Sequence, residues 1–120
     1  MKTTTAEQKA VFRRYVSIWQ RGELDELPEV VTPDYVGHAA TGNRGLYGLR
    51  DRISTFLSLY PDVRFVIEDQ IAEGNRVATR MTATATSAAT GEPVKLVGLN
   101  VSWFKDGRIA QEWPVWDILP

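Results

Sequence analysis

The spacing of the apolar residues changes once along the chain, at Pro61-Asp62, and this change constrains the fold more than any other feature. Before it, apolar residues recur at helical spacing in two segments, first as Val11, Tyr15, Ile18 and Trp19, and later as Leu46, Leu49, Ile53, Phe56 and Tyr60. After it, Val63, Phe65 and Ile67 alternate with polar residues, as in a half-buried strand. The sequence therefore predicts helices followed by a sheet, which is an α+β fold.

Local signals set the limits of three helices. Thr5 and Gln8 have the spacing of a capping box, and Gly22 is a stop signal, so the first helix is expected between them. A short second helix is expected over residues 26–31, with Pro28 in its first turn, where a missing N–H costs little. The third is expected over residues 46–60.

The rest of the chain reads as antiparallel strands joined by turns, over residues 63–68, 76–87, 93–104 and 108–118. Asp106-Gly107 is the strongest hairpin signal. We therefore expect one domain over residues 1–120, in which three N-terminal helices pack on a curved antiparallel sheet.

Composition excludes several classes of protein. The net charge of the 120 residues is −1, which gives no basic footprint for nucleic acid or a membrane surface. There is no cysteine and one histidine, so disulfides, thiolate chemistry and a multi-histidine metal site are excluded. The N-terminus lacks a signal-peptide pattern and no segment is long enough to span a bilayer, so we expect a cytoplasmic protein that uses neither metal nor cofactor.

Strand alternation suggests which side chains face the interior. Asn100, Ser102 and Phe104 share one face of their strand, and Trp113, Val115 and Asp117 share one face of the next. If the Trp113 face is the concave one, Asp117 becomes buried and its pKa rises toward the range useful for proton transfer. The alternative is that Asp117 is solvated at a frayed strand end, and that Trp113 is an ordinary core residue.

Four more polar residues are candidates for a site. Asn100 lies within the apolar run VGLNVSWF and needs partners or a polar cavity if it is buried. Tyr15 lies on the apolar stripe of the first helix, where its hydroxyl needs a partner. Arg80 is either a rim cation or an interior partner of Asp117. His38, before a glycine-rich loop, is either a proton carrier or an ordinary satisfied histidine.

The chain resembles the SnoaL-like polyketide cyclases of the nuclear-transport-factor-2-like superfamily along nearly its whole length. The stretches that carry the resemblance are RRYVSIWQRGELDELPEVVTPDYVGHAA, GLRDRISTFLSLYPDVRF, EDQIAEGNRVATRMT and VSWFKDGRIAQEWPVWD. The resemblance implies a cone-shaped α+β barrel around an apolar pocket. It also implies that Asp117 is the acid/base of an intramolecular aldol closure on a polyketide ester, without metal or organic cofactor, and that His38 is a pocket residue. Many cyclases have Gly-Thr-His where this chain has Ala85-Thr86-Ser87.

Two related families suggest other chemistries. By its likeness to ketosteroid isomerase, Tyr15 and Asn100 match oxyanion-hole positions and His38 matches the general base. By its likeness to limonene epoxide hydrolase, Arg80 and Asp117 match two members of an Asp-Arg-Asp arrangement, but Thr82 replaces the third, which weakens that reading. A ligand-binding module without catalysis is a further alternative on the same fold.

The sequence thus predicts an acid/base enzyme that acts on a small hydrophobic carbonyl compound of polyketide type. The expected catalytic residues are Asp117, His38, Asn100, Tyr15 and Arg80. The expected pocket residues are Trp19, Phe56, Thr82, Ser102, Phe104, Trp113 and Val115. A homodimer through the open sheet face is expected from the superfamily, with Trp103 and Trp116 on that outer face.

Overall fold

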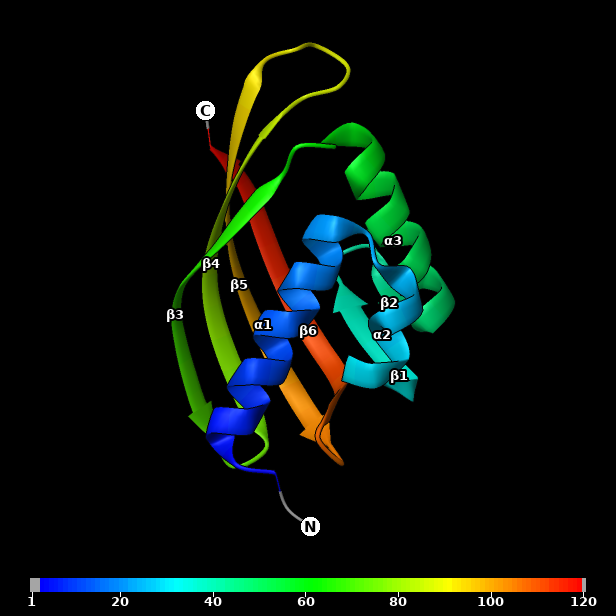
Figure 1. The fold of residues 1–120 in the computed structure, drawn as a ribbon, viewed down its shortest axis with the longest axis vertical. Coiled ribbons are helices and arrows are strands. Elements are labelled where there is room, and N and C mark those ends of the chain that lie inside the picture. The colour runs from blue at the N-terminus through cyan, green and yellow to red at the C-terminus, as the bar shows by residue number, and fades with distance from the viewer. Residues whose placement is uncertain (1–2, 120) are drawn as a thin grey trace.

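Three α-helices cover one face of a six-stranded sheet in the computed structural model, which describes residues 3–119 (Figure 1). The predicted α+β class and the three helices are confirmed. The helices are α1 (Thr5–Arg21), α2 (Leu27–Val30), which follows a 3₁₀ turn η1 (Leu24–Glu26), and α3 (Leu46–Leu59). The strands are β1 (Val31–Ala39), β2 (Gly42–Arg44), β3 (Arg64–Glu73), β4 (Arg76–Thr86), β5 (Pro93–Lys105) and β6 (Arg108–Leu119).

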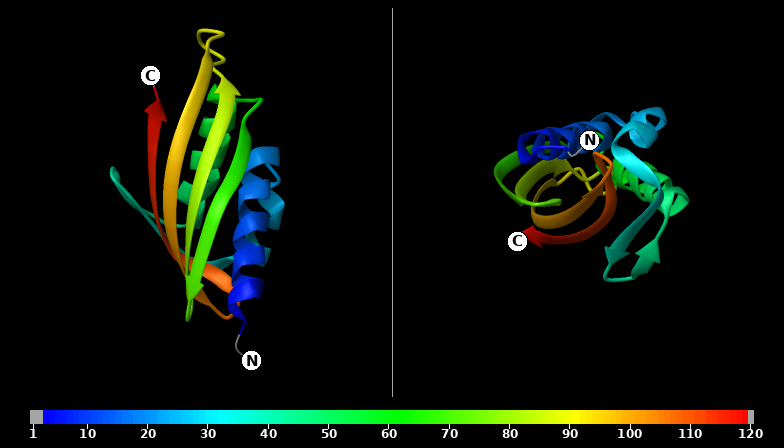
Figure 2. Two further views of the ribbon diagram at one scale, coloured as in Figure 1. Left: turned by 90° about the vertical axis from the view of Figure 1, so that its left-hand side faces the viewer. Right: turned by 90° about the horizontal axis from the view of Figure 1, so that it is seen from below.

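The sheet has the strand order β2-β1-β6-β5-β4-β3 and is mixed. Its neighbouring strands are antiparallel except for β1 and β6, which are parallel. The prediction of a wholly antiparallel sheet is therefore wrong at this pair, because the four predicted strands all follow residue 62, whereas β1 and β2 lie between α2 and α3. The sheet curves strongly, and α1 lies along its concave side (Figure 2).

Helix α1 begins one residue earlier than its sequence suggests. Thr4, not Thr5, accepts a hydrogen bond from the Glu7 backbone N–H, and the Glu7 side chain accepts one from the Thr4 N–H. The expected partner Gln8 is instead buried. Gly22 ends the helix as predicted, in the left-handed conformation with φ of 71°.

The main core lies between the helices and the concave face of the sheet. It includes Phe12, Ile18, Leu27, Leu49, Ile53 and Ile109, none of which is more than 1% exposed. A smaller cluster of Val63, Ala83, Ala85 and Leu96 continues it toward the far end of the sheet. Burial of these apolar faces holds the helices over the curved sheet.

A one-residue bulge in β6 decides which side chains enter this concave space. Phe104 pairs with Ile109, but the next residue back, Trp103, pairs with Gln111, so Ala110 has no partner across the strand pair. Ile109 and Glu112 are both buried although they are three residues apart, whereas a regular strand would bury positions two apart.

The bulge reverses the face of everything that follows it. In an uninterrupted hairpin Asn100 would face Trp113, but the observed partner of Asn100 is Pro114. Glu112, Pro114 and Trp116 therefore face the concave side, because a one-residue shift moves every later side chain to the opposite face.

We predict that deletion of Ala110 abolishes the native fold. Without the bulge, regular pairing would bury Asp117 and Val115 and expel Glu112 from its buried partners, which should cost about 4 kcal/mol or more of the free energy of unfolding. Urea denaturation followed by circular dichroism measures this. Deletion of Ala89, in the exposed turn after β4, should cost about 1 kcal/mol or less. A deletion of Ala110 as stable as the deletion of Ala89 would contradict the role of the bulge.

Candidate active site

A cavity of about 270 Å³ opens between α1, α3 and the concave face of the sheet. Most of its wall is apolar, with aromatic side chains from both helices and several strands, including Phe12, Trp19, Phe56, Phe65 and Trp116. Trp19 lies edge-on to Phe56 with ring centroids 5.7 Å apart. The chain thus builds a preformed apolar chamber of the kind that takes a small hydrophobic ligand.

One buried carboxylate interrupts this apolar wall. Glu112 is 4% exposed, and its Oε1 accepts hydrogen bonds from the hydroxyls of Tyr15, at 2.7 Å, and Tyr35, at 2.5 Å. Its Oε2 accepts a hydrogen bond from the Asn100 side-chain amide at 3.0 Å. The Ser102 hydroxyl donates a hydrogen bond to the side-chain Oδ1 of Asn100 at 2.7 Å. This bond fixes the amide so that its NH₂ group points at Glu112.

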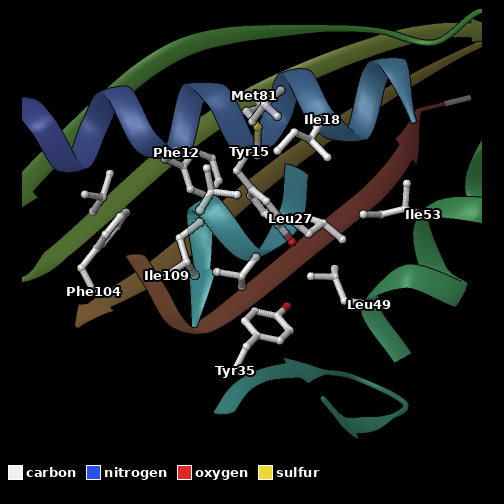
Figure 3. Close-up of a cluster of buried hydrophobic side chains, with 14 residues drawn as sticks. Phe12, Tyr15, Ile18, Leu27, Tyr35, Leu49, Ile53, Met81, Phe104 and Ile109 are labelled. Atoms are coloured by element: carbon white, nitrogen blue, oxygen red, sulfur yellow. The ribbon is translucent and has the colours of Figure 1, made fainter. Parts of the chain in front are cut away.

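Four separate elements bring these groups together. Tyr15 comes from α1, Tyr35 from β1, Asn100 from β5 and Glu112 from β6, where the bulge turns it inward. Figure 3 shows the hydroxyls of Tyr15 and Tyr35 directed toward the same space from opposite sides. Gly37 makes room for the second of these, since a Cβ there would lie 2.5 Å from the Tyr35 hydroxyl oxygen.

Hydrogen bonds, rather than an ion pair with a cation, stabilise the carboxylate of Glu112. Within residues 3–119, no Lys, Arg or His lies within ion-pair distance of Glu112. Oε1 has two donors, whereas Oε2 has one, and Glu112 is part of the cavity wall. Since each carboxylate oxygen can accept about two hydrogen bonds, Oε2 keeps a lone pair for a ligand.

The two tyrosines are held in their neutral form. Burial raises the pKa of Tyr15 well above its ordinary value, and the nearby charge of Glu112 raises it further. The same two causes, in the same order, raise the pKa of Tyr35. Both hydroxyls therefore remain hydrogen-bond donors at neutral pH.

Four of the predicted residues line this cavity. Asn100 and Tyr15 belong to the polar cluster, and Trp19 and Phe56 are part of the apolar wall. Ser102 is fully buried behind Asn100. Phe104 is also buried, but it packs in the main core and does not reach the cavity.

The prediction that Trp113, Val115 and Asp117 face inward is wrong. The bulge at Ala110 puts all three on the outer face of the sheet, where Val115 is 69% exposed and Asp117 is also exposed. The solvated alternative for Asp117 thus describes its position. Trp116, expected on the outer face, instead lies on the cavity side, over Gly98 of the neighbouring strand.

His38, Arg80 and Thr82 also lie outside the cavity. His38 stacks on Trp113, with ring centroids 4.3 Å apart, and its Nε2 lies 2.8 Å from the Gln111 Oε1. The expected inward position of His38 is therefore wrong, because the same outer face that holds Trp113 holds its imidazole. Arg80 and Asp117 are both exposed and neither lines the cavity, so Arg80 is not an interior partner of Asp117. Thr82 donates its hydroxyl hydrogen bond to Glu68.

Sequence reasoning missed Glu112, Tyr35 and Trp116 as cavity residues. One signal was available in Gly98, because a glycine inside a strand often marks the close approach of a large group. A Cβ on Gly98 would lie 2.6 Å from the Trp116 indole ring, which is its partner across the strand pair. That pairing would have indicated the true face of β6.

Residues 3–119 contain no group of three or more His, Cys, Asp or Glu side chains placed to hold a metal ion. No helix in the same range is both long and apolar enough to cross a membrane.

We predict that Tyr15 and Tyr35 ionise only as the protein unfolds. Their folded pKa values are raised above the unfolded value of about 10, so the stability they confer is complete below that pH and is lost as the pH rises above it. Ultraviolet absorbance should therefore show part of the tyrosinate signal appearing together with the loss of circular dichroism. Complete ionisation of all four tyrosines in the folded state would contradict this prediction.

We also predict that Tyr35→Phe destabilises the fold by about 1–3 kcal/mol, because the buried carboxylate loses one of its donors. Tyr47→Phe is the matched control, since Tyr47 is 88% exposed and should change the free energy of unfolding by less than about 0.5 kcal/mol. Urea denaturation of the two variants makes the comparison. Equal stabilities would show that the Tyr35 hydrogen bond contributes nothing.

Comparison with known proteins agrees with this architecture. Two similar solved structures are AclR from Streptomyces galilaeus, a proposed hydroxylase, and IdmH from Streptomyces antibioticus, a proposed polyketide cyclase. AclR is 26% identical, with a TM-score of 0.85 over 95% of this chain and 91% of its own. IdmH is 26% identical, with a TM-score of 0.84 over 92% of this chain and 91% of its own.

A third structure, a proposed polyketide cyclase from Acidithiobacillus ferrooxidans, shares the fold at 23% identity, with a TM-score of 0.83 over 97% of this chain and 92% of its own. No curated protein matches the sequence. The sequence profile described as SnoaL-like polyketide cyclase matches residues 9–120. With the profile spanning nearly the whole chain, this protein belongs to the SnoaL-like polyketide cyclase family.

Proposed function

We propose that the protein is an enzyme that moves a proton at a carbon next to a carbonyl group of an apolar substrate, with Glu112 as the proton carrier. The observation that carries the proposal is a buried carboxylate in the wall of an apolar cavity, with a single hydrogen-bond donor on its Oε2. Cyclase family membership supports an enzyme of this general type.

Glu112 has the position that a general base requires. Among the described residues 3–119, its Oε2 accepts one hydrogen bond, from the Asn100 amide, so we infer that a substrate C–H group in the cavity can approach the second acceptor position of this oxygen. Most of the wall is apolar, and surroundings of low polarity strengthen the electrostatic interaction between the carboxylate and the acidic proton.

The hydrogen-bond donors around Glu112 can follow the charge as it moves. When the carboxylate takes the proton, its negative charge passes to the carbonyl oxygen of the substrate, which becomes an enolate. Tyr15 and Tyr35 are then bound to a neutral acid and can donate instead to the enolate oxygen. Their raised pKa values keep the protons on these hydroxyls during the transfer.

The enolate carbon can then react in one of two ways. Attack on a second carbonyl of the same molecule closes a ring by an aldol step, and Glu112 returns its proton to the new alkoxide. Return of the proton at another carbon moves a double bond instead. Each route balances with groups of the chain and the substrate alone, and the proposed cyclase activity of the similar protein IdmH favours the first.

The test is hydrogen–deuterium exchange at carbon. 2-Tetralone, a fused-ring ketone with acidic C–H groups beside its carbonyl, is incubated with the protein in D₂O and followed by proton NMR. We expect the wild-type protein to accelerate exchange above the buffer rate. Glu112→Gln keeps the shape of the side chain but removes the base, and should lower the acceleration by about 10²-fold or more.

The variant Asp117→Asn distinguishes the role of Asp117 from that of Glu112, the other carboxylate of β6. The family resemblance predicts that this change removes activity, whereas the exposed position of Asp117 predicts that exchange continues at the wild-type rate. Wild-type exchange in Glu112→Gln would exclude Glu112 as the base. Binding of 2-tetralone without any exchange would favour the ligand-binding alternative.

A further inference from the structure

Two arginines on the cavity wall have no acidic partner. Arg44, at the end of β2, and Arg52, in α3, both line the cavity. Within residues 3–119, neither lies within ion-pair distance of a carboxylate. Apart from Glu112, they are the charged residues of the cavity wall, so the wall carries two positive charges and one negative charge.

Two glycines leave room for the aliphatic part of the Arg44 side chain. A Cβ on Gly48 would lie 2.7 Å from the Arg44 Cβ, and a Cβ on Gly37 would lie 3.3 Å from the Arg44 Cγ. Gly48 is inside α3, where glycine costs up to about 1 kcal/mol relative to alanine, and its backbone does not need a positive φ. Within residues 3–119, the three nearest atoms that a Cβ on Gly48 would meet all belong to Arg44, so glycine at this position leaves room for the Arg44 side chain.

Arg52 lies on the same side of α3 as this glycine. Residues 48 and 52 are four apart in the helix, so their side chains point in the same direction, one turn apart. Arg44 packs on the first of these turns and Arg52 extends from the next. Arg44 also lies near enough to the Tyr35 hydroxyl for its charge to oppose the rise in the pKa of that group.

Two guanidinium groups at the edge of an apolar cavity favour an anion there. Guanidinium groups bind carboxylate and phosphate oxygens through paired, charge-assisted hydrogen bonds. The negative charge of Glu112 in the same wall repels an anion, so an acidic group is favoured beside the arginines and not beside Glu112. A substrate with an acid in one part and a carbonyl in another would thereby be bound in one orientation.

We propose that the substrate carries an acidic group, a carboxylate or a phosphate, that Arg44 and Arg52 bind while its carbonyl portion reaches Glu112. The second part of this assignment, in which the carbonyl portion reaches Glu112, rests on the proposed function. The binding of the acid is independent of the reaction, because it depends on the two arginines and not on the carboxylate of the cluster.

The test compares matched ligands by isothermal titration calorimetry. 2-Naphthoate and 2-naphthyl phosphate carry the acidic group on an apolar ring system, and 2-naphthamide is the neutral control. We expect at least one acid to bind the wild-type protein about tenfold more tightly than the amide at low salt, and this preference to shrink at high salt. The tighter of the two acids identifies the acidic group.

The variants Arg44→Gln and Arg52→Gln should each lower the preference for the acid, and the double variant should abolish it. Arg50→Gln is the matched control, since Arg50 lies in the same helix but does not line the cavity, and it should keep the wild-type preference. Circular dichroism verifies that each variant is folded.

Binding of both acids no tighter than the amide, or no measurable binding of either, would overturn the proposal. A preference that survives in the double variant would overturn it too. Failure of the proposed function gives a different result, in which the acid preference is present but 2-tetralone does not exchange. The reverse result, exchange that depends on Glu112 without any acid preference, would overturn only the anion site.

Discussion

The buried carboxylate of Glu112 is the constraint on which the rest of the site depends. A charge placed in an apolar interior is stable only when hydrogen bonds replace the water it has lost. Here the replacements come from Tyr15, Tyr35 and Asn100, which belong to three different elements. The requirement therefore ties helix α1 to β1 and β5, the two strands that flank β6 in the sheet.

The same requirement links stability to chemistry. The donors that keep Glu112 buried are the groups that an enolate oxygen would need, so one cluster can stabilise the resting carboxylate and then the reaction intermediate. Arg44 and Arg52 add a second polar feature, of the opposite sign, to the same cavity wall. An apolar chamber that holds both a base and cations distinguishes the acidic part of a substrate from its carbonyl part.

Several parts of this arrangement could be predicted from local sequence. The change of period at Pro61-Asp62 marked the end of the last helix and the start of the β3–β6 part of the sheet, and Gly22 marked the end of α1. Asn100 and Tyr15 could be predicted as site residues, because a polar group in an apolar segment needs a hydrogen-bond partner when it is buried. These inferences succeeded because each depends on neighbours within a few residues. The parallel pairing of β1 with β6 depends on a contact between segments far apart in the sequence, and no local pattern predicts it.

By itself, the sequence determined the class of fold, the helices and the identity of the apolar cavity wall near Trp19 and Phe56. Only the tertiary structure decided which carboxylate of β6 is inside. The hydrophobic pattern of that strand allows two registers, and a single unpaired residue, Ala110, selects between them. Because strand side chains alternate, this one residue buries Glu112 and exposes Asp117.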